Sequence, residues 1–234
     1  MQKILEIPGD FRIRISSIEP DGFGKEFIDL FQHPKLAPHL HLCLQSGSEQ
    51  ILLKMRRMYN IDSYLELISS IKSQYPDFNL TTDIMVGFPG ETDQHFAESC
   101  NIVKQIGFSH VHTFKYSIRD HTTAARMQNQ VDEKTKQSRS EQIRELSHQN
   151  KLAYYQQFIG KNQQVLVEKR IDNRWFGYGE HYIPIVFESD EDLHNQFVSV
   201  KITAVEGDEK PVLKGQITDK NMIFEYQKLK VVNN

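Results

Sequence analysis

Cysteine is scarce in this sequence, and its scarcity argues against two kinds of architecture. The 234 residues include two cysteines, Cys43 and Cys100, which are neither paired nor clustered. Small disulfide-stabilised domains and thiolate metal sites both need several cysteines at short spacings. We therefore predict neither a disulfide framework nor a metal site made by this chain alone, and we expect both cysteines to be small buried hydrophobes.

Long apolar runs and a dominant charge sign are also missing. No segment approaches the roughly 18 consecutive apolar residues of a membrane span, and residues 1–10 lack the basic and then apolar layout of a secretory signal. The 28 basic and 31 acidic residues give a formal net charge of −3, which provides no overall attraction to nucleic acids or membranes. We predict a cytoplasmic protein in which any nucleic-acid binding is confined to a local surface.

The first 130 residues alternate between strand-like and helix-like patterns, which is typical of an α/β fold. Apolar residues alternate with polar ones in the predicted strands, whereas they recur every three or four residues in the predicted helices. Strands are predicted at residues 11–16, 39–44, 80–86 and 110–116, and helices at 24–32, 61–75 and 93–106. Because the connections are short, we expect a parallel sheet with right-handed crossovers, either open or curled into a barrel.

Polar segments, two of them containing glycine, follow these predicted strands. The carboxyl ends of parallel strands meet at one edge of a sheet, where α/β proteins bind their ligands. The segments are "SSIEP" (16–20), "QSGSE" (45–49), "GFPGET" (87–92) and "SIRDHT" (117–122). Gly87 and Gly90 would let a ligand approach the backbone, although a well-made turn before a helix also explains them. Such a rim suits a polar small molecule, for example a nucleoside or an amino acid.

A different pattern begins near residue 131. Residues 131–157 are polar, rich in helix-forming residues and marked by a sparse apolar stripe, which predicts a connecting helix. Five short strands are then predicted at residues 164–168, 174–178, 183–188, 197–205 and 212–217. Short strands separated by turn residues indicate a small β-barrel of the oligonucleotide-binding type.

One part of this predicted barrel combines aromatic and basic residues. Stacking faces and phosphate partners in one neighbourhood are typical of RNA-binding surfaces. The candidates are Lys169, Arg170, Arg174, Trp175 and Tyr178. Two observations weigh against RNA, because the module is acidic and the core of a small barrel also needs aromatic residues. The residue chemistry alone leaves both interpretations open.

Four histidines stand in pairs that could suggest a metal site. His39 and His41 share one face of a predicted strand, and His110 and His112 share one face of another. No third ligand stands at a fixed spacing from either pair, so polar positions inside a barrel are the simpler interpretation. We therefore predict no metal ligands among them.

Three segments, in this order and spacing, resemble one enzyme family. They are "HLHLCLQSGSEQILLKMRRMY" (39–59), "LTTDIMVGFPGET" (80–92) and "FKYSIRDHTTAARM" (114–127). They are similar to the radical S-adenosylmethionine methylthiotransferases, which modify tRNA or a ribosomal protein, and the likeness covers nearly the whole chain. "SSIEP" and "MRRMY" look most like the branch that acts on threonylcarbamoyladenosine in tRNA.

The resemblance implies a domain organisation and a set of site residues. Residues 1–130 would be the last four strands of a partial six-stranded (β/α) barrel, 131–157 a connecting helix, 158–220 an RNA-holding TRAM domain and 221–234 a tail. The implied cofactor-binding residues are Gln45, Ser46 and Ser48 on the ribose side, Val86, Gly87 and Phe88 near the adenine, and Tyr116, Arg119 and Glu19. Arg56 and Arg57 would approach the RNA, although cations are also favoured at the end of a helix.

The cluster-binding cysteines of the family are missing from this sequence. The family holds a catalytic 4Fe-4S cluster through a CxxxCxxC motif and a second cluster through an N-terminal domain, and neither motif is present. Because cluster ligation requires thiolates, the resemblance implies that the chain is a C-terminal piece of a longer enzyme. It would be inactive without the N-terminal region, and its open sheet edge at residues 11–16 would favour dimerisation.

The function implied by this resemblance is that of a transferase. It would use S-adenosylmethionine and 4Fe-4S clusters to add a methylthio group to threonylcarbamoyladenosine beside the tRNA anticodon. An isopentenyl-adenosine or ribosomal-protein substrate is the alternative within the same class. A cluster-free RNA-binding protein is the alternative in another class, and a native gene that extends upstream into CxxxCxxC would argue against it.

Overall fold

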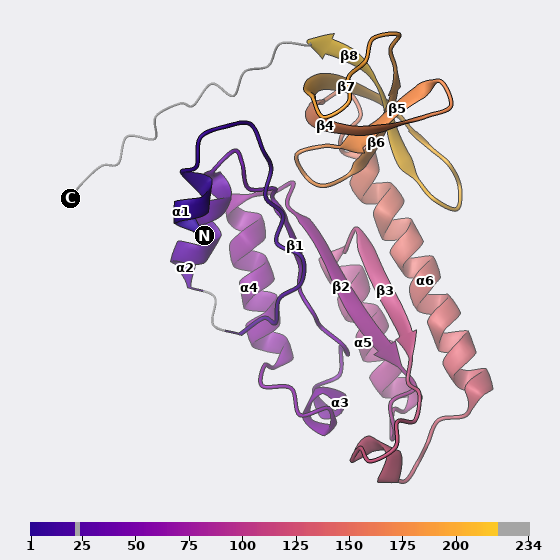
Figure 1. Ribbon diagram of the computed structural model, residues 1–234. Coiled ribbons are helices and arrows are strands. Elements are labelled where there is room, and N and C mark those ends of the chain that lie inside the picture. The colour runs from indigo at the N-terminus through magenta and orange to yellow at the C-terminus, as the bar shows by residue number, and fades with distance from the viewer. Residues whose placement is uncertain (22–23, 220–234) are drawn as a thin grey trace.

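A three-stranded parallel sheet forms the centre of the first half of the chain (Figure 1). The computed structural model describes residues 1–21 and 24–219. The strands are β1 (His39–His41), β2 (Asn79–Val86) and β3 (His110–Lys115), in the spatial order β1-β2-β3. Both pairings are parallel, so the predicted α/β class with a parallel sheet is confirmed.

Helices connect the strands and cover one face of the sheet. The two crossover helices, α4 (Ile61–Gln74) and α5 (Asp93–Ile106), each begin with a capping box, at Asn60 and Thr92. The α5 helix is capped at its carboxyl end by Gly107, which adopts the left-handed conformation typical of such a cap. The shorter elements are α1 (Gln2–Leu5), α2 (Lys25–Asp29), η1 (Leu30–Gln32), α3 (Glu49–Lys54) and η2 (Ala124–Arg126).

The core of this unit lies between the sheet and its helices. Strand residues such as Leu40, Ile84 and Val111 are almost completely buried and belong to the same apolar cluster as Ile68 and Val103 of the helices. Burial of side chains of this size stabilises the fold by roughly 1.5–3 kcal/mol each. The helix-facing side of the sheet is therefore the structural side, which leaves the other side for polar residues.

The strand predicted at residues 11–16 does not form. Within this region and its continuation, Ile13 makes one parallel bridge to Leu36, and Ile18 makes one to Leu42. Just before the first bridge, the side chain of Arg12 reaches the second half of the molecule, where it donates to the carbonyl oxygens of Gln164 and Tyr178. A β-strand needs a hydrogen-bonded neighbouring strand along its length. Among the described residues, this segment has a neighbour on one side only, and it pairs with that neighbour at two isolated bridges and not in a continuous ladder.

The second half of the chain contains one long helix and a closed barrel. Helix α6 (Glu133–Gln156) runs beside β3 and leads into five strands with the order β4-β5-β6-β8-β7 (Figure 1). They are β4 (Asn162–Ile171), β5 (Arg174–Tyr178), β6 (Pro184–Glu188), β7 (Phe197–Glu206) and β8 (Val212–Asp219). The predicted five-stranded barrel is confirmed, and α6 lies within the segment predicted as a connecting helix. The tail predicted at 221–234 lies outside the described residues.

The barrel packs against the amino ends of the sheet strands. Asn79, the first residue of β2, donates from Nδ2 to the carbonyl oxygen of His181 at 2.6 Å. The Tyr154 hydroxyl donates to the carbonyl oxygen of Asp77 at 2.7 Å. The half-buried Arg12 guanidinium donates to the carbonyl oxygens of Gln164 and Tyr178 at 3.0 and 3.1 Å, and desolvation lowers its pKa to about 10. Consequently the barrel and the carboxyl ends of the strands lie at opposite ends of the sheet (Figure 1).

None of the helices within residues 1–21 and 24–219 combines the length and the apolar character that crossing a bilayer requires.

Candidate functional site

Two neighbouring cavities open at the carboxyl ends of the strands. Their volumes are about 250 and 360 Å³, and both are lined by Met85, Phe88 and Ala124. The first is also lined by Gln45, Lys54, Met55, Arg56, Arg57, Thr123 and Met127, and the second by Phe114, Lys115, Tyr116, Ser117, Arg119 and Thr122. The polar rim predicted from the sequence thus exists, and three of its four segments meet there.

The segment after β1 approaches the second strand through backbone geometry. Gln45 has a φ of +65°, and its backbone exchanges hydrogen bonds with Asp83 and Met85 of β2. Ser46 is fully buried, with its Oγ 3.4 Å from that of Ser99, and it accepts from the backbone N–H of Ser48 at 3.2 Å. Gln45 therefore lines the cavity, whereas Ser46 is held by helix α5 and has a supporting role.

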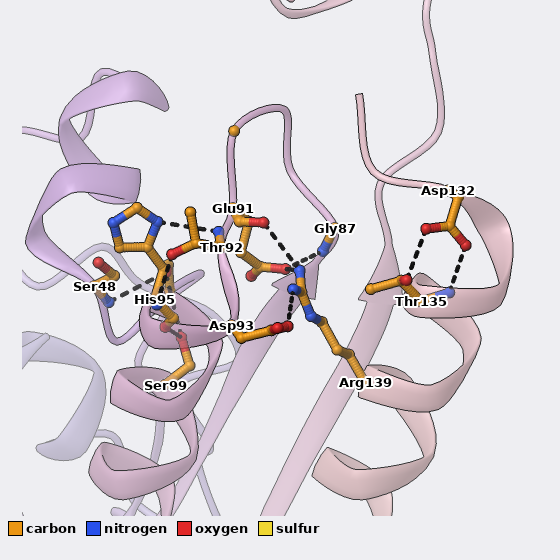
Figure 2. Close-up of polar contacts among 12 residues, drawn as sticks. Ser48, Gly87, Glu91, Thr92, Asp93, His95, Ser99, Asp132, Thr135 and Arg139 are labelled. Carbon is orange, nitrogen blue, oxygen red and sulfur yellow. Dashed lines mark hydrogen bonds and ion pairs between the residues drawn. The ribbon is translucent and has the colours of Figure 1, made fainter. Parts of the chain in front are cut away.

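The turn after β2 is held in place by a buried ion pair. Gly87 has a φ of +73°, and its N–H donates to Glu91 Oε2 at 2.6 Å. The same oxygen lies 2.7 Å from Nη1 of Arg139, and Nη2 of Arg139 lies 2.7 Å from Asp93 (Figure 2). Burial raises the pKa of Glu91, against the effects of the Gly87 N–H and of Arg139. Helix α6 thereby fixes the turn that bounds the rim.

The wall of the rim contains the buried hydroxyl of Tyr116. Phe88 and Tyr116 are both buried, with ring centroids 5.4 Å apart in an edge-on arrangement. Among the described residues, no group makes a hydrogen bond with the Tyr116 hydroxyl or with that of the buried Ser48. Leaving such a group unpaired costs about 1–3 kcal/mol, which is typical of sites that are completed by a ligand or by water.

The remaining predicted rim residues lie at its edge. Arg57 forms an ion pair with Glu19 at 2.7 Å, and Arg56 has a φ of +59° just after helix α3. Arg119 lines the second cavity and is exposed. Val86 is fully buried in the core at the end of β2, so its side chain supports the turn and does not line either cavity.

The residues predicted to bind RNA do not form one surface. Lys169, Arg170 and Arg174 are exposed on the hairpin of β4 and β5, where Arg174 is paired with Glu206 at 2.8 Å. Trp175 is 5% exposed in the barrel core, and its Nε1 donates to the carbonyl oxygen of Glu191. The prediction that Trp175 offers a stacking face is therefore wrong for this structure, because the barrel core needs that ring. Tyr178 instead lines a third cavity.

This third cavity lies on the polar face of the sheet, beside the barrel. It has a volume of about 600 Å³ and is lined by residues of the strands, of helix α6 and of the barrel. The pKa values of its histidines are shifted in opposite directions. Burial lowers the pKa of His39 to about 3 and that of His110 to about 4, whereas hydrogen bonds with Asp83 and Cys43 raise the pKa of His41 to about 9.

Sequence reasoning missed two features of these sites. Arg139 stands 48 positions from Glu91, on a helix that the sequence marks as a connector, so no local spacing links the two. Asp83 and Cys43 lie beside His41 because neighbouring strands bring them together. For the second feature a signal was available, since alternate residues of adjacent parallel strands share one face of the sheet.

Comparisons with known proteins point to one family. Residues 1–103 match the family model of the radical SAM superfamily. The threonylcarbamoyladenosine tRNA methylthiotransferase of Thermotoga maritima is 37% identical over 88% of this chain and 48% of the relative. The tRNA-2-methylthio-N(6)-dimethylallyladenosine synthase of Alkaliphilus oremlandii is 37% identical over 86% of this chain and 44% of the relative.

Among solved structures, coproporphyrinogen III oxidase from Escherichia coli, a radical SAM enzyme, aligns with 64% of this chain and 34% of its own, at a TM-score of 0.45 and 16% identity. The chain spans about half the length of the curated relatives it matches.

Proposed function

Because residues 1–103 match the radical SAM model and the chain is similar to tRNA methylthiotransferases, we propose that it is the cofactor-orienting and RNA-docking part of such an enzyme. The reaction would add a methylthio group to threonylcarbamoyladenosine beside the tRNA anticodon. A cytoplasmic location belongs to the same proposal, because action on tRNA agrees with it. One observation carries the proposal. The three segments that resemble the family, far apart in sequence, converge on two cavities that share Met85, Phe88 and Ala124.

The radical SAM family implies S-adenosylmethionine and 4Fe-4S clusters as cofactors. The rim fits the first of these, because the buried Tyr116 hydroxyl has no hydrogen-bond partner within residues 1–21 and 24–219, and Gln45 lines the cavity together with the aromatic Phe88. When bound, S-adenosylmethionine supplies the radical and the methyl-transfer chemistry of this family. The residues that would hold it are Gln45, Phe88 and Tyr116, with Glu91 and Arg139 fixing the turn between them.

The residues present do not fit a 4Fe-4S cluster. A cluster needs three or four thiolates, whereas Cys43 and Cys100 are the two cysteines of the chain, one after β1 and the other on helix α5. No step through a cluster is therefore derived. We propose that the cluster thiolates come from an N-terminal region of the longer polypeptide, and that this chain alone is inactive. The predicted dimer belongs to the same proposal, since Ile13 and Ile18 make isolated bridges at the sheet edge.

Nucleoside mass spectrometry of tRNA tests the proposed function. Deleting the full-length gene should abolish methylthio-threonylcarbamoyladenosine in total tRNA, and re-expression should restore it. Loss of the methylthio-isopentenyl nucleoside instead would keep the enzyme class and change the substrate, as the equal identity to both kinds of relative allows. No change in either nucleoside would reject tRNA methylthiolation and favour a ribosomal-protein substrate or a non-catalytic RNA-binding role.

Replacing Gln45 tests the proposed cofactor site. We expect Gln45→Ala to weaken S-adenosylmethionine binding about tenfold, because one lost hydrogen bond costs about 1.4 kcal/mol. Isothermal titration calorimetry on the 234-residue chain measures the change. Gln94→Ala, an exposed glutamine on helix α5, is the matched control and should bind like the wild type. Equal affinities for the two variants would remove Gln45 from the site.

The exposed basic residues of the barrel provide a test of RNA docking. Lys169 and Arg170 lie on the outer end of β4, with their charges near the rings of Phe176 and Trp175. We expect Lys169→Glu/Arg170→Glu to weaken binding of an anticodon stem-loop and to lower the salt dependence of log Kd by about two, one for each lost phosphate contact.

Fluorescence anisotropy at several salt concentrations measures both effects. Lys104→Glu/Lys134→Glu changes the net charge equally, on helices α5 and α6, and is the control. If both double variants lose the same affinity, the effect reflects net charge and the β4 and β5 hairpin is not the RNA surface.

A further inference from the structure

Three side chains of the types that bind metal ions, those of His41, Cys43 and Asp83, meet on the polar face of the sheet. The Nε2 of His41 lies 3.2 Å from Asp83 Oδ1, and the Sγ of Cys43 lies 3.9 Å from Asp83 Oδ2. The ligand atoms of the three residues all lie within 4.8 Å of one another. In the described part of the chain, this is the one group of at least three such residues that could hold a metal ion.

The sheet itself brings these residues together. His41 and Cys43 stand two positions apart on β1 and its continuation, so they share a face. His41 pairs in register with Thr81 of the parallel strand β2. Two residues further along each strand, Cys43 and Asp83 therefore lie side by side on the same face of the sheet. On the other side, Asp83 pairs in register with His112 of β3. The arrangement therefore depends on backbone register and not on flexible loops.

The surroundings of His41 orient one nitrogen toward the cluster. Its Nδ1 lies 3.0 Å from the Oγ1 of Thr81, which leaves Nε2 directed at Asp83. Metal-binding histidines are usually oriented in this way, through a hydrogen bond on the other ring nitrogen. His41 and Cys43 are buried, at 9% and 8% exposure, so bulk water competes weakly for their ligand atoms.

We propose that His41, Cys43 and Asp83 bind a divalent transition metal ion of the zinc class. Imidazole, thiolate and carboxylate are the donor types that zinc takes, at 2.0–2.3 Å, which places the ligand atoms of a tetrahedral ion roughly 3.2–3.8 Å apart. Asp83 places Oδ1 3.2 Å from Nε2 of His41 and Oδ2 3.9 Å from Sγ of Cys43, and the three ligand atoms all lie within 4.8 Å of one another. The first distance already has the spacing of a bound ion, and the Cys43 side chain closes in on the ion when it binds. Binding releases the protons carried by the ligands, and the metal takes the place of the hydrogen bonds that now join them.

The fourth coordination position faces the cavity of about 600 Å³. His41 and Asp83 both line this cavity, together with Arg14, Lys151, Tyr178 and Tyr182. Sites with three protein ligands and one open position are typical of metals that bind a water or a further ligand, whereas structural zinc sites use four protein ligands. The two basic residues favour an anionic ligand at the open position.

Cobalt titration of the 234-residue chain tests the site, because Co²⁺ replaces zinc and reports thiolate ligation by a charge-transfer absorption. The wild type should bind one Co²⁺ per chain with this absorption, and added Zn²⁺ should abolish it. Cys43→Ser should lose the absorption, and Asp83→Asn should bind Co²⁺ at least about tenfold more weakly. Both replacements are nearly isosteric, and circular dichroism confirms that each variant is folded.

Cys100→Ser is the matched control, because Cys100 lies on helix α5, among the residues of a different cavity. Its Co²⁺ absorption should equal that of the wild type. Absence of the absorption in the wild type, its persistence in Cys43→Ser, or its loss in Cys100→Ser would each overturn the proposal. Zinc found by mass spectrometry in the purified wild type and not in Cys43→Ser would support it without a cobalt probe.

Discussion

Replacing Arg139 with methionine should destabilise the protein by about 3–5 kcal/mol at neutral pH. Removing one partner of a buried ion pair leaves the other charge uncompensated, and this cost is typical of such cases. The Arg139 and Glu91 side chains are 6% and 1% exposed, and their 2.7 Å contact is the only ion pair that Glu91 makes in the described part of the chain. The free energy of unfolding, measured by urea denaturation with circular dichroism, gives the loss.

The pH dependence of this loss has a defined sign. Burial already raises the pKa of Glu91, and removing Arg139 raises it further. In the variant, the folded state therefore binds a proton at a higher pH than the unfolded state does. Such a group contributes stability when it is protonated and loses that contribution as the pH rises. The deficit of Arg139→Met relative to the wild type should shrink as the pH is lowered from neutrality.

Two further variants separate the ion pair from other effects. Asp93 is the second ion-pair partner of Arg139, and its side chain is 98% exposed. Asp93→Asn should therefore lower the free energy of unfolding by less than about 1 kcal/mol. Glu91→Gln/Arg139→Met removes both buried charges, while the amide oxygen can still accept from the Gly87 N–H, and should recover part of the stability. A loss for Arg139→Met no larger than that for Asp93→Asn would show that the buried pair does not hold the turn.

Replacing Gly47 with alanine should cost about 3 kcal/mol, the upper end of the range for overpacking a tight interior. A Cβ at this position would lie 2.5 Å from the Cα of Ser99 and 3.0 Å from the carbonyl oxygen of Glu98. These are backbone atoms of helix α5, so no side-chain rotation relieves the clash. The shift would also disturb the hydrogen bond from the Gly47 N–H to Ser99 Oγ at 2.9 Å.

Thermal and urea unfolding of Gly47→Ala measure this effect, and Gly24→Ala is its control. Gly24 also has an ordinary φ, but a Cβ there would meet nothing within 4 Å, so its replacement should change stability by less than about 0.5 kcal/mol. Equal stability of the two variants would mean that helix α5 can move away from the rim. The close contact between α5 and the segment after β1 would then not limit the residue at position 47.

The strand, helix and turn pattern was readable because each feature depends on nearby residues. The helix that begins after Thr92 and ends at Gly107 formed as its cap residues predict, since capping involves residues within a few positions. The five barrel strands followed their turn residues in the same way. The segment at 11–16 was misread because its alternating pattern is local, whereas a strand requires partners supplied by the rest of the fold.

The α/β class, the polar rim and the likeness to radical SAM methylthiotransferases were evident from the sequence, because periodicity and motif spacing are properties of contiguous residues. Tertiary structure alone decided that Trp175 belongs to the barrel core, that Arg139 holds the turn at Gly87, and that His41, Cys43 and Asp83 meet. Each of these findings depends on contacts between residues that are at least 16 positions apart in the sequence. Arg139 and Glu91, for example, are 48 positions apart. Burial and strand register set those distances, and neither is encoded in local spacing.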